Sequence, residues 1–125
     1  MHKGDKKIIA VVGDLLFMAK INEAAKRAGM PVEYVTAEKD VLEKAKAKPT
    51  LIILDLNLES SHPLELVQKL KASAETRGVS LIGYLSHVQG ELKLKAQDAG
   101  CDQVMPRSAF SVNLPQILRR HVGMI

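Results

Sequence analysis

The sequence predicts an α/β protein with a doubly wound, five-stranded parallel sheet and helices on both of its faces. Short apolar runs rich in β-branched residues alternate along the chain with segments of helical periodicity. The apolar runs are nearly continuous, which is typical of strands buried on both faces. Glycine and proline stand between many of the segments, where turns are needed. Strict alternation of strand and helix favours a parallel sheet with right-handed crossovers.

The predicted elements follow one another without a linker or a repeat. The predicted strands are residues 6–12, 32–36, 50–55, 79–86 and 101–106. The predicted helices are residues 15–28, 37–48, 63–73, 90–99 and about 114–122. We therefore expect residues 1–125 to be a single domain with its core at about 6–122, and we expect no output domain.

The first half of the chain supports three strands and two helices. The run KKIIAVV opens the sheet, and the first helix then repeats apolar residues at helical spacing, namely Leu15, Met18, Ala19, Ala25 and Ala28. Gly29 suits the end of that helix, and Pro31 prevents its continuation. VEYVT gives the second strand. In the helix that follows, Val41, Leu42 and Ala45 are expected to face inward, and Pro49 separates it from the third strand, TLIILD.

The second half continues the alternation. The third helix carries one apolar stripe, made of Leu64, Leu66, Val67 and Leu70. VSLIGYLS is the fourth strand, and Gly100 ends the helix after it. CDQVMP is a short fifth strand. Asn113 and Pro115 are residues that suit a helix start, so the last helix is predicted to begin near Leu114.

Composition excludes several classes of function. Aromatic residues make up only 3% of the chain, which disfavours a base-stacking surface, and the 18 Lys and Arg are interleaved with 14 acidic residues, giving a net charge of +4. We therefore expect no direct binding to nucleic acid. The single cysteine, Cys101, allows no internal disulfide, and no apolar run is long enough to span a membrane. A cytoplasmic protein without a membrane contact is the expectation.

Polar residues follow four of the predicted strands where those strands end. Asp14 follows the first strand, Asp55 closes the third, Ser86 closes the fourth and Arg107 follows the fifth. In open α/β sheets the site lies beyond the carboxyl ends of the strands, so these side chains should converge. Two carboxylates, a hydroxyl and a cation form a group that could hold a divalent metal and a phosphoryl group.

Two stretches carry a resemblance to a known family. Residues 51–72 (LIILDLNLESSHPLELVQKLKA) and 96–108 (AQDAGCDQVMPRS) resemble the receiver domains of two-component response regulators, which have a flavodoxin-like fold. The resemblance runs from about Lys6 to about His121. It implies a receiver domain that takes part in a phosphorelay.

The resemblance implies a role for each matching residue. Asp55 matches the phosphorylated aspartate, Ser86 the hydroxyl residue that ends strand four, and Arg107 the strand-five lysine. Asp14, Asp55 and the backbone carbonyl of Asn57 match the Mg²⁺ ligands. The resemblance implies a histidine kinase or phosphotransfer protein as one partner. It also implies a downstream protein bound through the fourth and fifth helices, and a possible homodimer.

The chain departs from the family pattern at several of these positions. Gly13 replaces the first residue of the acidic pair, so Mg²⁺ should bind weakly or be absent. A guanidinium at position 107 is not interchangeable with a lysine ammonium. Glu59, Pro63 and Ser108 also differ from the family pattern, and Val104 stands where the family carries an aromatic ring. We therefore expect an atypical stand-alone receiver that signals through protein–protein interaction, with Asp55 as a weak or inactive phosphoacceptor.

Alternatives remain open from the sequence. The chain could be a small flavodoxin-like protein that binds a ligand or FMN, although no phosphate-binding loop follows the first strand, or it could be a structural dimerisation domain. It is not expected to be an enzyme beyond self-phosphorylation at Asp55. Asp14 could cap the first helix, Ser86 could bond only the turn backbone, and Arg107 could form a standing ion pair with Asp55 or Asp14. His62 and His87 show no further ligands at metal-binding spacing, and His87 could border the site entrance.

Overall fold

The structure contains one five-stranded parallel sheet. The computed structural model describes residues 7–86 and 90–121. The strands are β1 (Ile8–Val11), β2 (Val32–Tyr34), β3 (Leu51–Asp55), β4 (Ser80–Leu85) and β5 (Gln103–Pro106). They lie in the order β2–β1–β3–β4–β5, and each neighbouring pair is parallel. The predicted α/β class and the doubly wound, flavodoxin-like sheet are confirmed.

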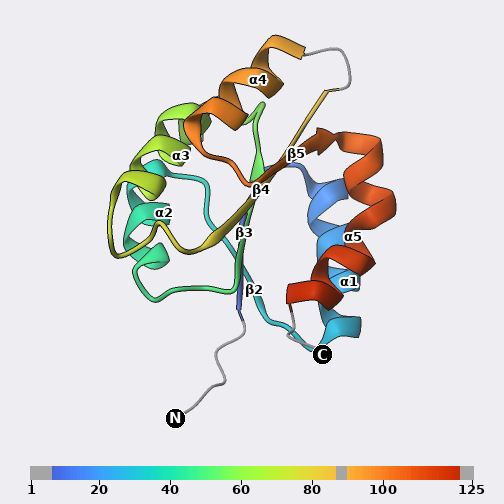
Figure 1. Cartoon of the computed structure of the whole chain (residues 1–125). Coiled ribbons are helices and arrows are strands. Elements are labelled where there is room, and N and C mark those ends of the chain that lie inside the picture. Colours follow the sequence, from blue (N-terminus) through green and yellow to red (C-terminus); the bar gives the residue numbers. More distant parts are fainter. Residues whose placement is uncertain (1–6, 87–89, 122–125) are drawn as a thin grey trace.

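Helices cover both faces of the sheet. They are α1 (Leu15–Ala28), α2 (Glu38–Ala45), α3 (Pro63–Ala72), α4 (Gly90–Ala99) and α5 (Arg107–His121), and a 3₁₀ turn, η1 (Glu59–Ser61), precedes α3. Figure 1 shows α1 and α5 together on one face, with α2, α3 and α4 on the other. None of the helices in the described ranges has the length and apolar content needed to cross a membrane.

The hydrophobic core is divided by the sheet into two halves. Successive side chains of a strand point to opposite faces. Leu51 and Ile53 of β3 accordingly pack with the α1–α5 side, whereas Ile52 and Leu54 pack with the α2–α3–α4 side. This alternation explains why β3 is apolar at four successive positions, and it leaves Asp55 at the carboxyl end of the row that begins with Leu51 and Ile53.

The buried face of α1 differs from the predicted one. Its buried side chains are Phe17, Ile21 and Ala25, spaced four residues apart. Leu15 is 80% exposed, and Ala19 is exposed as well. These two residues share the apolar spacing of the predicted helix but do not reach the core, because Leu15 lies in the first turn, at the carboxyl edge of the sheet, and Ala19 follows it at the i+4 position on the same side.

The predicted start of the last helix is also wrong. α5 begins at Arg107, eight residues before Pro115, which lies inside the helix. Phe110, Leu114, Ile117 and Leu118 are buried at helical spacing. This burial outweighs the cost of the proline, which removes one backbone donor and crowds the carbonyl four residues earlier. Asn113 does not cap a helix start, because its Nδ2 donates to the backbone carbonyl of Ala109 within α5 at 2.8 Å.

Candidate functional site

The strand-end residues lie at one edge of the sheet, beyond the carboxyl ends of β1, β3, β4 and β5. The strand order places β1 and β3 side by side, with β4 and β5 following. Asp14 therefore lies beside Asp55, and Arg107 enters from the start of α5. The structure brings Asp14, Asp55 and Arg107 close enough for the charges of Asp14 and Arg107 to act on Asp55. The fourth predicted residue, Ser86, reaches the same edge, where its backbone N–H donates to Asn57.

Asp14 has two structural partners. It is the N-cap of α1, where its Oδ1 accepts hydrogen bonds from the backbone N–H groups of Leu16 at 2.8 Å and Phe17 at 3.4 Å. Its Oδ2 accepts from Nη2 of Arg107 at 3.3 Å. The helix-cap alternative and the ion-pair alternative are thus both present, and each uses a different oxygen of the same carboxylate.

The Arg107 guanidinium makes two kinds of contact: its planar face lies over aromatic rings, and its edge donates to Asp14. The guanidinium carbon lies 4.9 Å from the centroid of the Phe17 ring and 5.8 Å from that of the Tyr84 ring. A guanidinium over an aromatic face is attracted by the negative potential of that face. Together with the Asp14 ion pair, these rings give Arg107 a defined resting position, which a lysine could not reproduce with the same planar contact.

Asp55 is a buried carboxylate. It is 7% exposed, and its Oδ1 accepts a hydrogen bond from the backbone N–H of Asn57 at 2.9 Å. Burial raises the pKa of Asp55, while the Asn57 hydrogen bond and the charge of Arg107 act in the opposite direction. The charged form is therefore disfavoured at this site, so a cation or a hydrogen-bond donor that arrives beside Asp55 would be stabilising.

Asn57 connects Asp55 to the end of β4. Its backbone N–H donates to Asp55, and its side-chain Oδ1 accepts from the backbone N–H of Ser86 at 3.1 Å. A shift in the position of the Asp55 carboxylate could therefore be passed to Ser86, the residue that follows β4, through Asn57 alone. His87, expected at the site entrance, lies outside the described residues.

Tyr84 is a site residue that the sequence reasoning did not identify. Its ring stacks on Phe17 and on Phe110, with centroid distances of 4.8 and 4.9 Å, and these two rings are themselves 6.2 Å apart, so the three form one aromatic cluster. The side chain is fully buried, and burial followed by the charge of Asp55 raises its pKa. An aromatic residue in a strand usually indicates only core packing, and the pairing of position 84 with position 55 becomes visible only in the sheet register.

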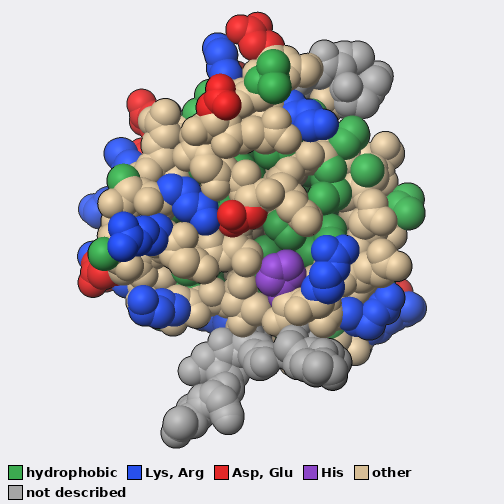
Figure 2. All heavy atoms as spheres, in the orientation of Figure 1, with side chains coloured by type: hydrophobic (Ala, Val, Ile, Leu, Met, Phe, Trp, Pro, Cys, Tyr) green, Lys and Arg blue, Asp and Glu red, His purple; other side chains and the backbone are tan. Residues whose placement is uncertain are grey.

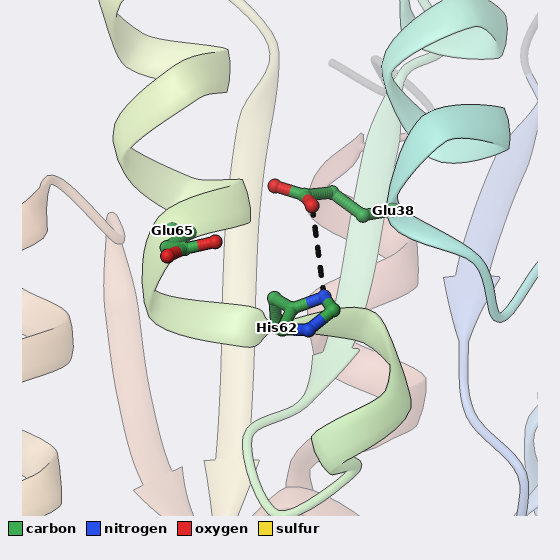
Figure 3. Close-up of side chains that lie close together, drawn as sticks. All are labelled: Glu38, His62 and Glu65. Atoms are coloured by element: carbon green, nitrogen blue, oxygen red, sulfur yellow. Dashed lines mark ion pairs between the residues drawn. The ribbon is translucent and has the colours of Figure 1, made fainter.

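A second polar cluster links the starts of α2 and α3. Figure 3 shows Glu38, His62 and Glu65 lying close together there. Their potential ligand atoms are all within 4.8 Å of one another. His62 Nδ1 lies 3.6 Å from Oε1 of Glu38, and Lys69 Nζ lies 3.0 Å from Oε2 of the same carboxylate. The expectation that His62 lacks further donor groups is wrong, because the fold brings two glutamates to it. Since Lys69 already pairs with Glu38, we interpret the cluster as ion pairing between α2 and α3.

Comparisons with known proteins identify the fold. No protein-family model matches the chain, and no curated protein matches its sequence. Among solved structures, a response regulator from Hahella chejuensis has a TM-score of 0.83 at 18% identity, over 95% of this chain and 96% of that one. The receiver domain of a Pseudomonas aeruginosa sensor histidine kinase has a TM-score of 0.80 at 17% identity, over 97% of this chain and 100% of that one.

A third similar structure is the Mn²⁺-bound form of the response regulator Rcp1, with a TM-score of 0.81 at 12% identity, over 96% of each chain. The Pseudomonas domain carries a magnesium ion coordinated in its active-site cleft. The chain therefore has the fold of response-regulator receiver domains over nearly its whole length.

The oxygen atoms of this site are of the type that binds a divalent cation, but some of them already accept hydrogen bonds. Two carboxylates, those of Asp14 and Asp55, and the Asn57 backbone carbonyl are the hard oxygen ligands that Mg²⁺ takes. Both oxygens of Asp14 are engaged, however, and Gly13 offers no side chain. A cation at Asp14 would share this carboxylate with Arg107, and the donor set is otherwise of the kind that Mg²⁺ takes.

Proposed function

We propose that the protein is an atypical receiver domain of a two-component phosphorelay, in which Asp55 accepts a phosphoryl group. One observation carries the proposal: a buried carboxylate ends the central strand β3, with a guanidinium held beside it at the carboxyl edge of a receiver fold. Burial without a neutralising partner is costly for a carboxylate, and a functional role explains why it is kept there.

The proposed chemistry is attack by a carboxylate oxygen of Asp55 on the phosphorus of a phosphohistidine. A new O–P bond forms and the P–N bond breaks. The imidazole leaves with the electron pair and takes up a proton. Arg107 faces the negative charge that spreads over the phosphoryl oxygens, and the Ser86 hydroxyl offers a hydrogen bond to one of them. A small phosphodonor supplies the same group without a kinase.

A metal ion has a supporting role in this proposal. Mg²⁺, held by Asp14, Asp55 and the backbone carbonyl of Asn57, would neutralise part of the charge on the phosphoryl oxygens. The competition between Mg²⁺ and Arg107 for Asp14 makes the reaction slow at ordinary metal concentrations. The protein has no other catalytic activity in this account and works as a cytoplasmic signalling domain.

The proposed partners are a histidine kinase or phosphotransfer protein on the input side and a protein bound through α4 and α5 on the output side. Leu94 of α4 is 62% exposed and Val112 of α5 is 78% exposed. Figure 2 shows hydrophobic side chains on the part of this face near α5, while Lys and Arg side chains are dispersed over the rest. The same surface would serve a homodimer, which Leu94→Ser should weaken in sedimentation measurements.

Intact mass spectrometry after incubation with a small phosphodonor and Mg²⁺ tests the proposal. We expect the wild type to gain the mass of one phosphoryl group slowly. The Asp55→Asn variant, which is nearly isosteric, should gain none. A folded wild-type protein that gains no phosphoryl group at long times would overturn the proposal and leave a binding module with the receiver fold.

A further inference from the structure

The buried Tyr84 hydroxyl has no hydrogen-bond partner among residues 7–86 and 90–121. A buried polar group without a partner costs free energy, so each such group in a native protein needs an explanation. Arg107 lies near enough for its charge to favour the ionised hydroxyl, yet a guanidinium has only donors. Within the described residues the hydroxyl proton therefore lacks an acceptor, whatever Arg107 offers to the oxygen.

The position of Tyr84 connects this proton to the site. Tyr84 and Asp55 are register partners on the adjacent parallel strands β4 and β3. The side chain of Tyr84 packs on the α1–α5 face, and Asp55 continues the row of Leu51 and Ile53 toward the same face. The charges of Asp55, Arg107 and Asp14 all act on the Tyr84 hydroxyl. The free donor thus lies in the electrostatic surroundings of the proposed phosphoacceptor.

We propose that the Tyr84 hydroxyl is a positioning group of this site, which donates a hydrogen bond to an oxygen of the tetrahedral anion carried by Asp55. The inference rests on the proposed function, because it assigns the donor to the group that Asp55 receives. No proton is transferred, and Tyr84 stays neutral throughout. The aromatic stack with Phe17 and Phe110 fixes the ring, so the donor is held in place before the anion arrives.

The other tyrosine of the chain provides a matched control. The Tyr34 hydroxyl is satisfied, since it lies 2.9 Å from the backbone carbonyl of Met18 and 2.7 Å from Oδ1 of Asn22. Tyr34→Phe removes a hydroxyl that is hydrogen-bonded, whereas Tyr84→Phe removes one that has no partner in the part of the chain that the structure describes. The two variants should therefore change stability in opposite directions in the unmodified protein.

The test measures two quantities for the wild type, Tyr84→Phe and Tyr34→Phe. The first is the urea midpoint of unfolding, which should rise in Tyr84→Phe and fall in Tyr34→Phe. The second is the affinity for beryllofluoride, a tetrahedral mimic of a carboxylate-bound phosphoryl group, followed by fluorine NMR. We expect Tyr84→Phe to bind it at least about tenfold more weakly, and Tyr34→Phe to bind it as the wild type does.

Each result has a distinct meaning. A lower urea midpoint for Tyr84→Phe would show that the hydroxyl is satisfied internally and would overturn the inference. Unchanged beryllofluoride affinity in Tyr84→Phe, with binding intact in the wild type, would also overturn it and leave the proposed function standing. A wild type that neither binds beryllofluoride nor forms a phosphoryl adduct would overturn the proposed function, and the inference with it.

Discussion

Arg107 and Asp14 form an ion pair of 3.3 Å at the carboxyl edge of the sheet, between residues that are 93 positions apart in the chain. The Arg107 side chain is 43% exposed and that of Asp14 is 34% exposed, so water weakens the pair. The pair matters because the Arg107 guanidinium already occupies the Asp14 carboxylate, which a bound metal ion would need as a ligand.

Removing this cation should strengthen metal binding. In Arg107→Gln, Asp14 loses its charged partner, while the shorter side chain stays polar. We expect Mg²⁺ affinity to rise about two- to fivefold, the range that corresponds to a partly exposed ion pair. Calorimetric titration measures this change. Equal or weaker Mg²⁺ binding in Arg107→Gln would contradict the competition between Arg107 and the metal.

Restoring a carboxylate at position 13 should act in the same direction. A Cβ atom on Gly13 would lie 3.3 Å from Cδ1 of Leu58, so the leucine side chain must shift slightly to accept it. We expect Gly13→Asp to bind Mg²⁺ more tightly than the wild type, because a hard cation gains a charged oxygen ligand. Gly13→Asn is the matched control, since it has the same size without the charge and should gain much less.

The two functions of Asp14 can be separated by two substitutions. Asp14→Ala removes both the N-cap of α1 and the ion pair, and should lower the free energy of unfolding by about 1–2 kcal/mol. Asp14→Asn keeps an oxygen that can cap the helix and loses only the charge, so its cost should be about 0.5 kcal/mol. Urea unfolding of both variants checks this order. Equal costs would mean that the cap contributes little.

Asp55 should make stability depend on pH. Burial raises its folded-state pKa, so the folded protein binds this proton more tightly than the unfolded chain. The contribution of Asp55 to stability is most favourable below its unfolded-state pKa. It is lost as the pH rises through the acidic range to the folded-state pKa. Asp55→Asn should therefore be more stable than the wild type at neutral pH, and the difference should vanish in acid.

Urea unfolding of the wild type and Asp55→Asn at several pH values checks this sign. A substitution that lowers stability at neutral pH would mean that favourable contacts of the charged carboxylate, such as the Asn57 hydrogen bond and the field of Arg107, outweigh its desolvation.

The sheet could be predicted from the sequence because buried parallel strands have a strong local signal. The run Ile8–Val11 and the run that ends at Asp55 are nearly all apolar, and helical periodicity separates them. The start of α5 could not be predicted in the same way. Pro115 carries a helix-start signal, but burial of Phe110 extends the helix back to Arg107, and burial depends on tertiary contacts.

The sequence predicted that three of these strand-end residues lie together, but neither their pairing nor the position of Tyr84 beside them. Strand-end positions identify Asp14, Asp55 and Arg107, because parallel strands deliver their carboxyl ends to one edge. Arg107 pairs with Asp14 while its guanidinium lies over the rings of Phe17 and Tyr84. These rings come from α1 and β4, so the choice of carboxylate depends on tertiary contacts. The Tyr84 hydroxyl, which has no partner among the described residues, is likewise visible only once the three-dimensional surroundings are known.

The most direct test of the central claim is to locate the phosphoryl group. The protein is incubated with a small phosphodonor and Mg²⁺, reduced with borohydride, which converts an aspartyl phosphate to homoserine, and then digested for peptide mass spectrometry. The account predicts homoserine at position 55 in the wild type and none in Asp55→Asn. Homoserine at another aspartate, or an unmodified Asp55 peptide from a folded protein, would contradict it.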